Sequence, residues 1–163
     1  YSLARYVLLE KAGLLLDAYV EDLDRTLGEE LLEPTRIYAK DCLALADECE
    51  VHTFCHVTGG GLAGNLARVI PTGLVAELSR GTWVPGPIFR LIQNVGKVPQ
   101  AEMEKTFNMG VGMVAVVAPE DRDRALAMLT ARHIDAWELG TIRDADDLQA
   151  PGAVVLTGDH PGY

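Results

Sequence analysis

Hydrophobic and polar residues alternate over residues 51–57, and this period of two predicts a strand. The strand delivers His56 to its end, beside three consecutive glycines. A nearly continuous apolar run over residues 111–117 predicts a second strand, buried at the centre of a sheet. Further strands are predicted at 73–78, 137–142 and 153–156. The two faces of the first strand are expected to carry Val51, Thr53, Cys55 and Val57 on one side and His52, Phe54 and His56 on the other.

Helical patterns are interspersed among these strands. Ser2 is expected to cap a first helix that carries Leu3, Tyr6 and Val7 on one face and stops at Gly13. A turn over residues 33–36 leads into a short extended segment at 37–39. Further helices are predicted at 41–48, 62–70, 88–93, 99–107 and 119–132. Because helices and strands mix irregularly, the sequence predicts an α+β domain rather than a strictly alternating parallel sheet.

The composition is that of one globular domain. The chain has 163 residues, of which 48% are hydrophobic and 23% charged. The net charge of −10 argues against nucleic acid or an anionic membrane as the main partner, since both need clustered Lys and Arg. No apolar run is long enough for a membrane span. Cys42, Cys49 and Cys55 form no C-x-x-C pair, which is typical of a reducing compartment, so a cytoplasmic location is expected.

Two features of the N-terminal part add to this picture. The chain begins at Tyr1 without Met and enters a helical pattern at once, which predicts that it is one domain of a longer polypeptide. Between Asp17 and Glu33, seven acidic residues face a single basic residue, Arg25. This stretch predicts a solvated acidic face or loop.

The segment GGGLAG, residues 59–64, matches the dinucleotide-binding pattern G-x-G-x-x-G, with Glu77 downstream. Pro71 leaves only a short helix after it, and Glu77 lies inside its own predicted strand, so a Rossmann site is disfavoured. A Walker loop is excluded, because no Lys-Ser or Lys-Thr pair follows the last glycine. Two interpretations remain: the glycine amides at a helix N-terminus hold an anionic or carbonyl oxygen, or the glycines form a structural turn.

His56 is the leading candidate for proton transfer or hydrogen bonding at that oxygen, because imidazole exchanges protons near neutral pH. A structural role in the strand is the alternative. His52 lies on the same face, but no third ligand is evident, so no metal site is predicted. His133 and His160 are expected at the surface. No Ser-His-Asp or Cys-His grouping is supported by spacing.

Two further polar residues are candidates for ligand contact. Asn108 precedes the apolar run, where its side chain either hydrogen-bonds a ligand or caps a turn. Arg36 follows Pro34, where it either meets a phosphate or neutralises the acidic stretch before it.

Five segments then occur in a distinctive order: YSLAR, LLEPTRIY, HVTGGGLAGNLARVIP, GTWVPGPIFRLIQ and KTFNMGVGMVAVV. Together they resemble the C-terminal domain of the aminoimidazole ribonucleotide synthetase family, the cyclo-ligases of purine biosynthesis. The resemblance runs from Tyr1 to about Ile142. The GTWVPGPIFRLIQ segment favours the cyclo-ligases over their relatives, which include formylglycinamidine ribonucleotide synthetase, selenophosphate synthetase, thiamine-phosphate kinase and a hydrogenase maturation factor.

The resemblance implies a three-layer α/β/α domain with a mixed sheet, partly ferredoxin-like. It implies an enzyme that closes formylglycinamidine ribonucleotide to aminoimidazole ribonucleotide while ATP is split to ADP and phosphate with Mg²⁺. The formyl oxygen is activated by phosphorylation, and a ring nitrogen then attacks. The family forms homodimers of two-domain chains, in which the N-terminal domain holds most ATP and metal contacts and the C-terminal domain lines the active-site cleft.

Residues 1–163 would then be the substrate-side domain alone, inactive without its N-terminal domain and holding no cofactor by itself. By position in the motifs, the resemblance makes His56 the catalytic or substrate-orienting residue. It assigns substrate contacts to Thr58, Gly59, Gly60, Gly61, Asn108 and Arg36. The alternatives are another ATP-using enzyme of the same superfamily and a stand-alone ligand-binding module without catalysis.

Overall fold

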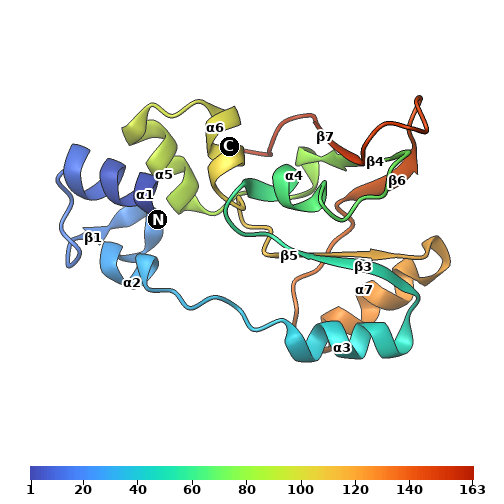
Figure 1. The fold of residues 1–163 in the computed structure, drawn as a ribbon. Coiled ribbons are helices and arrows are strands. Elements are labelled where there is room, and N and C mark those ends of the chain that lie inside the picture. The colour runs from blue at the N-terminus through green and yellow to red at the C-terminus, as the bar shows by residue number, and fades with distance from the viewer.

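The strands fall into three small sheets in the computed structural model, which describes residues 1–163 (Figure 1). The central strand of the largest sheet pairs antiparallel with one neighbour and parallel with the other, so the predicted α+β class and mixed sheet are confirmed. The sheets are the antiparallel hairpin of β1 (Tyr19–Val20) and β2 (Arg25–Thr26), the antiparallel pair of β3 (Val51–His56) and β5 (Met113–Val117), and the mixed sheet β6-β4-β7, formed by β6 (Gly140–Asp144), β4 (Leu74–Ser79) and β7 (Ala153–Thr157).

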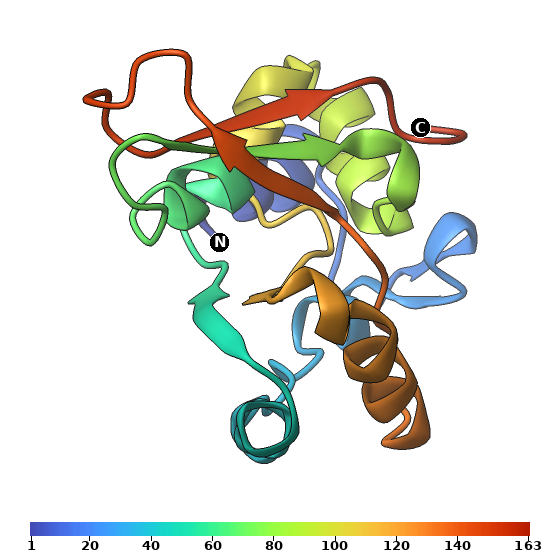
Figure 2. The ribbon, with the colours of Figure 1, turned by 90° about the vertical axis from the view of Figure 1, so that its right-hand side faces the viewer.

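Helices cover both faces of the β3–β5 pair. Figures 1 and 2 show α3 and α7 on one side of this pair and α4 on the other, with the β6-β4-β7 sheet beyond α4. The helices are α1 (Ser2–Arg5), the π-helix η1 (Tyr6–Lys11), η2 (Glu21–Leu23), α2 (Leu27–Leu31), α3 (Ala39–Glu48), α4 (Gly61–Leu66), η3 (Arg80–Thr82), α5 (Pro87–Gly96), α6 (Gln100–Thr106), η4 (Pro119–Asp121) and α7 (Arg122–Ala131). No helix is both long and apolar enough to span a membrane.

Three clusters of buried side chains hold these layers together. The first lies among β3, α4 and β4 and includes Cys55, Leu66 and Ala76. The second joins the N-terminal helices to α5 and α6, and the third packs α3 and α7 onto the β3–β5 pair. Alternate residues of β5 face the first and third clusters, so β5 separates two cores.

A β-bulge corrects the predicted faces of the first strand. Val51 pairs with Val117 but Thr53 already pairs with Val116, so β3 carries one extra residue at His52. The extra residue brings Val51 onto the α3–α7 side, where Phe54 also packs. Beyond the bulge the predicted alternation holds.

The prediction of a buried central strand at 111–117 is wrong. β5 begins at Met113, pairs only with β3, and all five of its residues are half-buried. Its other edge has no strand beside it, so its apolar residues reflect two half-covered faces rather than a central position.

The first predicted helix is also corrected. Ser2 lies inside α1 and caps nothing, and Tyr6 is 55% exposed, because the turn widens into the π-helix η1 after Arg5. Ala4, Val7 and Leu8 are the buried residues of this segment. Gly13 ends it with a φ of +64°, as expected.

The other predicted helices all differ from the observed ones at one or both ends, and among the largest differences are those at α4 and α7. α4 stops at Leu66 because, after the Ala67 amide, the amides of Arg68 and Val69 bond three residues back in tighter turns. The segment predicted as one helix over 119–132 opens with the 3-10 turn η4 before α7. The strand predicted at 137–142 instead covers residues 140–144 as β6.

Candidate active site

His56 is the last residue of β3, and its side chain is exposed rather than part of a core. Its backbone pairs with Met113 of β5, and the next residue, Val57, is buried and donates its N–H to the Gly112 carbonyl oxygen at 2.9 Å. The Tyr38 ring meets the imidazole edge-on, with centroids 5.8 Å apart. The strand pair therefore holds the backbone of His56 while its ring nitrogens stay accessible.

The glycine segment follows directly, and two of its glycines are required by the fold. Gly60 has a φ of +100° and Gly61 a φ of +69°, in the left-handed region. A Cβ on Gly61 would lie 1.7 Å from the Glu104 carbonyl oxygen, so α6 packs directly on this backbone. Gly59 differs: its φ is not positive, and a Cβ there would meet nothing within 4 Å.

Arg68, which no sequence pattern marks as functional, lies beside the glycine segment. A Cβ on Gly60 would be 3.8 Å from Nη2 of Arg68, which is exposed and forms no ion pair. Burial raises the pKa of the Cys55 thiol, and the positive charge of Arg68 opposes that rise. The amides of Gly59 and Gly60 donate no hydrogen bond within the chain. Two free amide donors and a free cation therefore lie close together, although α4 is only six residues long and adds little dipole.

Asn108 lies next to the glycine segment, and its side-chain oxygen caps a turn. Oδ1 accepts a hydrogen bond from the Gly110 amide at 3.0 Å, whereas its Nδ2 donates none within the chain. The Phe107 carbonyl oxygen lies 3.2 Å from a Cβ on Gly61, so the turn that follows it adjoins the glycine segment. The Trp83 indole N–H donates to the Met109 carbonyl oxygen at 3.0 Å, which ties the GTW motif to this turn.

Arg36 is exposed on the segment that leads to α3 and forms no ion pair. The idea that it neutralises the acidic stretch is wrong, because Arg25 pairs with Glu33 at 2.7 Å and with Glu30 at 3.6 Å. Tyr38, two residues on, contacts His56, so Arg36 belongs to a segment that reaches the site.

The expectation that His160 is a surface residue is wrong. Its side chain is 1% exposed, its Nε2 has no hydrogen-bond partner, and its ring lies edge-on to Trp83, with centroids 4.5 Å apart. Its Nδ1 lies 3.2 Å from the Arg80 carbonyl oxygen. No local periodicity marks this residue, because segments distant in sequence bury it. His133 is exposed, as expected.

Beside His160 lies a bidentate pair that the sequence did not reveal. Arg80 donates to Oε1 of Glu104 at 2.7 Å and to its Oε2 at 2.9 Å. Burial alone would raise the pKa of Glu104, but hydrogen bonds from Arg80 and Gln100 outweigh it and hold that pKa below its ordinary value of 4.5. The bond to Glu104 raises the pKa of Arg80. Since Glu104 belongs to α6, which packs on Gly61, this pair supports the site from behind.

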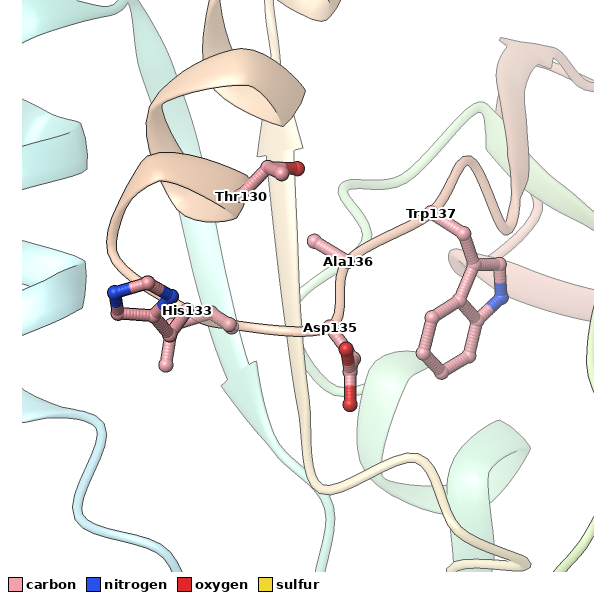
Figure 3. A pocket seen from close by; sticks show the side chains of 6 residues that line it. Thr130, His133, Asp135, Ala136 and Trp137 are labelled. Atoms are coloured by element: carbon pink, nitrogen blue, oxygen red, sulfur yellow. The ribbon is translucent and has the colours of Figure 1, made fainter.

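A surface hollow of about 410 Å³ lies elsewhere, in the connection that follows α7 (Figure 3). No residue of the glycine segment or of the Asn108 turn lines it, and no group of three His, Cys, Asp or Glu side chains in the chain is arranged to hold a metal ion. The hollow is lined by Thr130, His133, Ile134, Asp135, Ala136 and Trp137. The candidate site is therefore the surface around His56 and the glycine segment, not this hollow.

Comparison with known proteins assigns the family. The profile of the family described as AIR synthase related protein, C-terminal domain, matches residues 1–151. The chain is 58% identical over 161 residues to a putative phosphoribosylformylglycinamidine cyclo-ligase of Streptomyces fradiae, covering 98% of this chain and 88% of that protein. It is 51% identical over 142 residues to the phosphoribosylformylglycinamidine cyclo-ligase of Myxococcus xanthus, covering 87% of this chain and 41% of that protein. The chain thus spans about two fifths of the longer relative, and it belongs to the family of AIR synthase related protein C-terminal domains.

Proposed function

We propose that residues 1–163 form the substrate-side domain of a cyclo-ligase of purine biosynthesis. The reaction converts formylglycinamidine ribonucleotide and ATP to aminoimidazole ribonucleotide, ADP and phosphate. The observation that carries this proposal is the identity of 51% and 58%, over most of the chain, to proteins that bear the cyclo-ligase name. In the longer relative the match covers 41% of the protein. This coverage supports the proposal that the chain acts together with a further, N-terminal domain of the same protein.

Gly59 supports a ligand at the glycine segment. The fold itself explains Gly60 and Gly61, by their backbone angles and by the contact with α6. It does not explain Gly59, which has an ordinary φ and open space around it. Gly64 is equally open, but only Gly59 lies among the unpaired Gly59 and Gly60 amides, so its bare backbone leaves room for a ligand to approach those donors.

The donors around Gly59 suit the phosphate of a ribonucleotide substrate. The amides of Gly59 and Gly60 are free, and Arg68 adds a positive charge in a chain whose net charge is −10. Guanidinium and peptide N–H groups are the common partners of phosphate oxygens. Thr58, Asn108 and Arg36 complete the proposed contacts, with the free Nδ2 of Asn108 as a further donor. The expected contact by Gly61 is not proposed, because Gly61 is buried and its N–H already donates to the Thr58 carbonyl oxygen.

His56 is proposed to act on the reacting end of the substrate. Ring closure forms a C–N bond, breaks the bond from carbon to the activated oxygen, releases phosphate and removes a proton from the attacking nitrogen. An exposed imidazole held edge-on by Tyr38 can accept that proton. Loss of such a base typically slows a reaction by about 10²–10⁴-fold.

Mg²⁺ does not fit the residues of this chain. Mg²⁺ prefers several oxygen ligands in octahedral geometry, and no group of three carboxylate, His or Cys side chains is arranged for a metal here. We therefore propose that the N-terminal domain holds Mg²⁺ together with the ATP that it accompanies, and we derive no step through either. A homodimer of complete chains and a cytoplasmic location, which suits three free cysteines, are parts of the same proposal.

Activity of the complete protein tests this proposal. With its N-terminal domain attached, the protein should form aminoimidazole ribonucleotide from formylglycinamidine ribonucleotide, ATP and Mg²⁺, and the isolated chain should not. His56→Ala should lower kcat at least ~100-fold, because the proton acceptor is removed. His52→Ala is the matched control, an exposed histidine on the same strand, and should leave kcat within about twofold of wild type. Equal rates for wild type and His56→Ala would refute the assignment.

A further inference from the structure

Asn65 is a buried polar side chain directly behind the glycine segment. It lies on α4 and is 6% exposed, although asparagine is usually found at the surface. Its Nδ2 lies within hydrogen-bond distance of three carbonyl oxygens, those of Thr58 at 3.3 Å, Gly59 at 3.2 Å and Gly61 at 2.7 Å. Its Oδ1 accepts from the Thr58 hydroxyl at 3.4 Å. One amide group therefore holds most of the backbone from Thr58 to Gly61.

Because peptide bonds are planar, the contacts that Asn65 makes with these carbonyls also fix the direction of the N–H groups on the opposite side of the segment. In a trans peptide the carbonyl of one residue and the N–H of the next point in opposite directions. The Thr58 carbonyl faces Asn65, so the Gly59 N–H points away from Asn65. The Gly59 carbonyl also faces Asn65, so the Gly60 N–H points away from Asn65 as well. These are the two amides that lack a partner within the chain.

We propose that Asn65 is a positioning residue, which aims the Gly59 and Gly60 amides at the substrate phosphate by holding the preceding carbonyls against α4. This inference rests on the proposed role of the glycine segment and adds the device that sets its orientation. Without the Asn65 amide, the Gly59 carbonyl loses its partner, and the Thr58 carbonyl keeps only the Gly61 N–H, at 3.3 Å. The peptide that carries the Gly60 N–H is then free to rotate, and the one that carries the Gly59 N–H is held less firmly. Either carbonyl turned outward would place an oxygen, rather than a donor, before the phosphate.

Two substitutions separate orientation from charge. Asn65→Asp keeps the size of the side chain but removes the donor and adds a negative charge. Asn65→Ser is neutral and smaller, and its single hydroxyl can donate to only one carbonyl. Asn94→Asp is the matched control, because Asn94 is exposed on α5 and makes no side-chain hydrogen bond.

The probe is ribose 5-phosphate, titrated into the ¹⁵N-labelled 163-residue chain and followed by NMR. In wild type, the Gly59 and Gly60 amide resonances should move. Asn65→Asp and Asn65→Ser should raise Kd at least ~10-fold and abolish these two movements, since the donors no longer face the phosphate. Resonances of the α3–α7 core should stay in place, and Asn94→Asp should bind as wild type does.

The outcomes distinguish the two proposals. If the wild-type Gly59 and Gly60 resonances do not respond, the proposed role of the glycine segment fails. If they respond and Asn65→Ser binds with the wild-type Kd, the segment keeps its role and the positioning role of Asn65 is wrong. An unfolded Asn65→Ser chain would also overturn the positioning role, because Asn65 would then be needed by the whole domain.

Discussion

Alanine substitutions at Gly59, Gly61 and Gly64 distinguish a glycine that the fold requires from a glycine that ligand binding requires. All three glycines lie in one short segment, so their surroundings in sequence are nearly the same. Their surroundings in space differ: a Cβ on Gly61 would meet the Glu104 carbonyl oxygen at 1.7 Å, whereas a Cβ on Gly59 or Gly64 would meet nothing within 4 Å. The same change therefore has three different expected results.

The magnitudes follow from these contacts. Gly61→Ala places a side chain at a φ of +69°, which costs about 1–3 kcal/mol. The clash with the backbone of α6 adds to this, so a loss of at least ~3 kcal/mol and a fall in Tm of roughly 6 °C or more are expected. Gly64→Ala, in the exposed face of α4, should stabilise the chain by about 0.5–1 kcal/mol. Gly59→Ala should stay within about 1 kcal/mol of wild type.

The assay pairs thermal unfolding of each variant with the KM of the complete protein for formylglycinamidine ribonucleotide. Gly59→Ala should raise KM at least ~10-fold without lowering Tm, because the added methyl occupies the space of the bound phosphate. Gly64→Ala should leave KM unchanged. A Gly59→Ala variant with wild-type KM would refute a ligand at this backbone, and one as unstable as Gly61→Ala would show that the fold does need the glycine.

Two further predictions concern charged residues. Arg68→Ala should raise KM for the same substrate about tenfold with little change in kcat, since its charge binds the phosphate away from the reacting atoms; unchanged KM would exclude this contact. Glu104→Gln should lower the free energy of unfolding by about 2 kcal/mol at neutral pH, as measured by urea denaturation. Because the pKa of Glu104 is held below its ordinary value of 4.5, its contribution is present above that pH and is lost as pH falls through the lowered pKa. The variant and wild type should therefore converge in acid, and a constant difference at all pH values would contradict this explanation.

Local patterns predicted the elements that depend on neighbouring residues. The alternation before the glycines placed β3, and Gly13 marked the end of the first helical segment. The bulge at His52 escaped prediction, because it is defined by pairing with a strand some sixty residues away in sequence. The half-buried state of β5 escaped for a similar reason: an apolar run does not show how many partners a strand has.

The candidate site was predicted in outline from its glycines and from His56. Its supporting residues were not, since Asn65 and Arg68 look like ordinary helix residues until the chain folds back on itself. The burial of His160 depends on Arg80 and Trp83, which lie far from it in sequence. At Arg36 the sequence left two roles open, because it does not show that the arginine that reaches Glu33 is Arg25. Long-range contacts of this kind leave no periodic trace.

The central claim is that the end of β3 and the glycine segment together face the substrate of a cyclo-ligase. A crystal structure of the complete protein with formylglycinamidine ribonucleotide bound tests this most directly. The substrate phosphate should lie within hydrogen-bond distance of the Gly59 and Gly60 amides and of Arg68, with the reacting end of the substrate toward the His56 imidazole. A substrate bound at another surface, with His56 and the glycine segment left in contact with solvent or with protein alone, would contradict the claim.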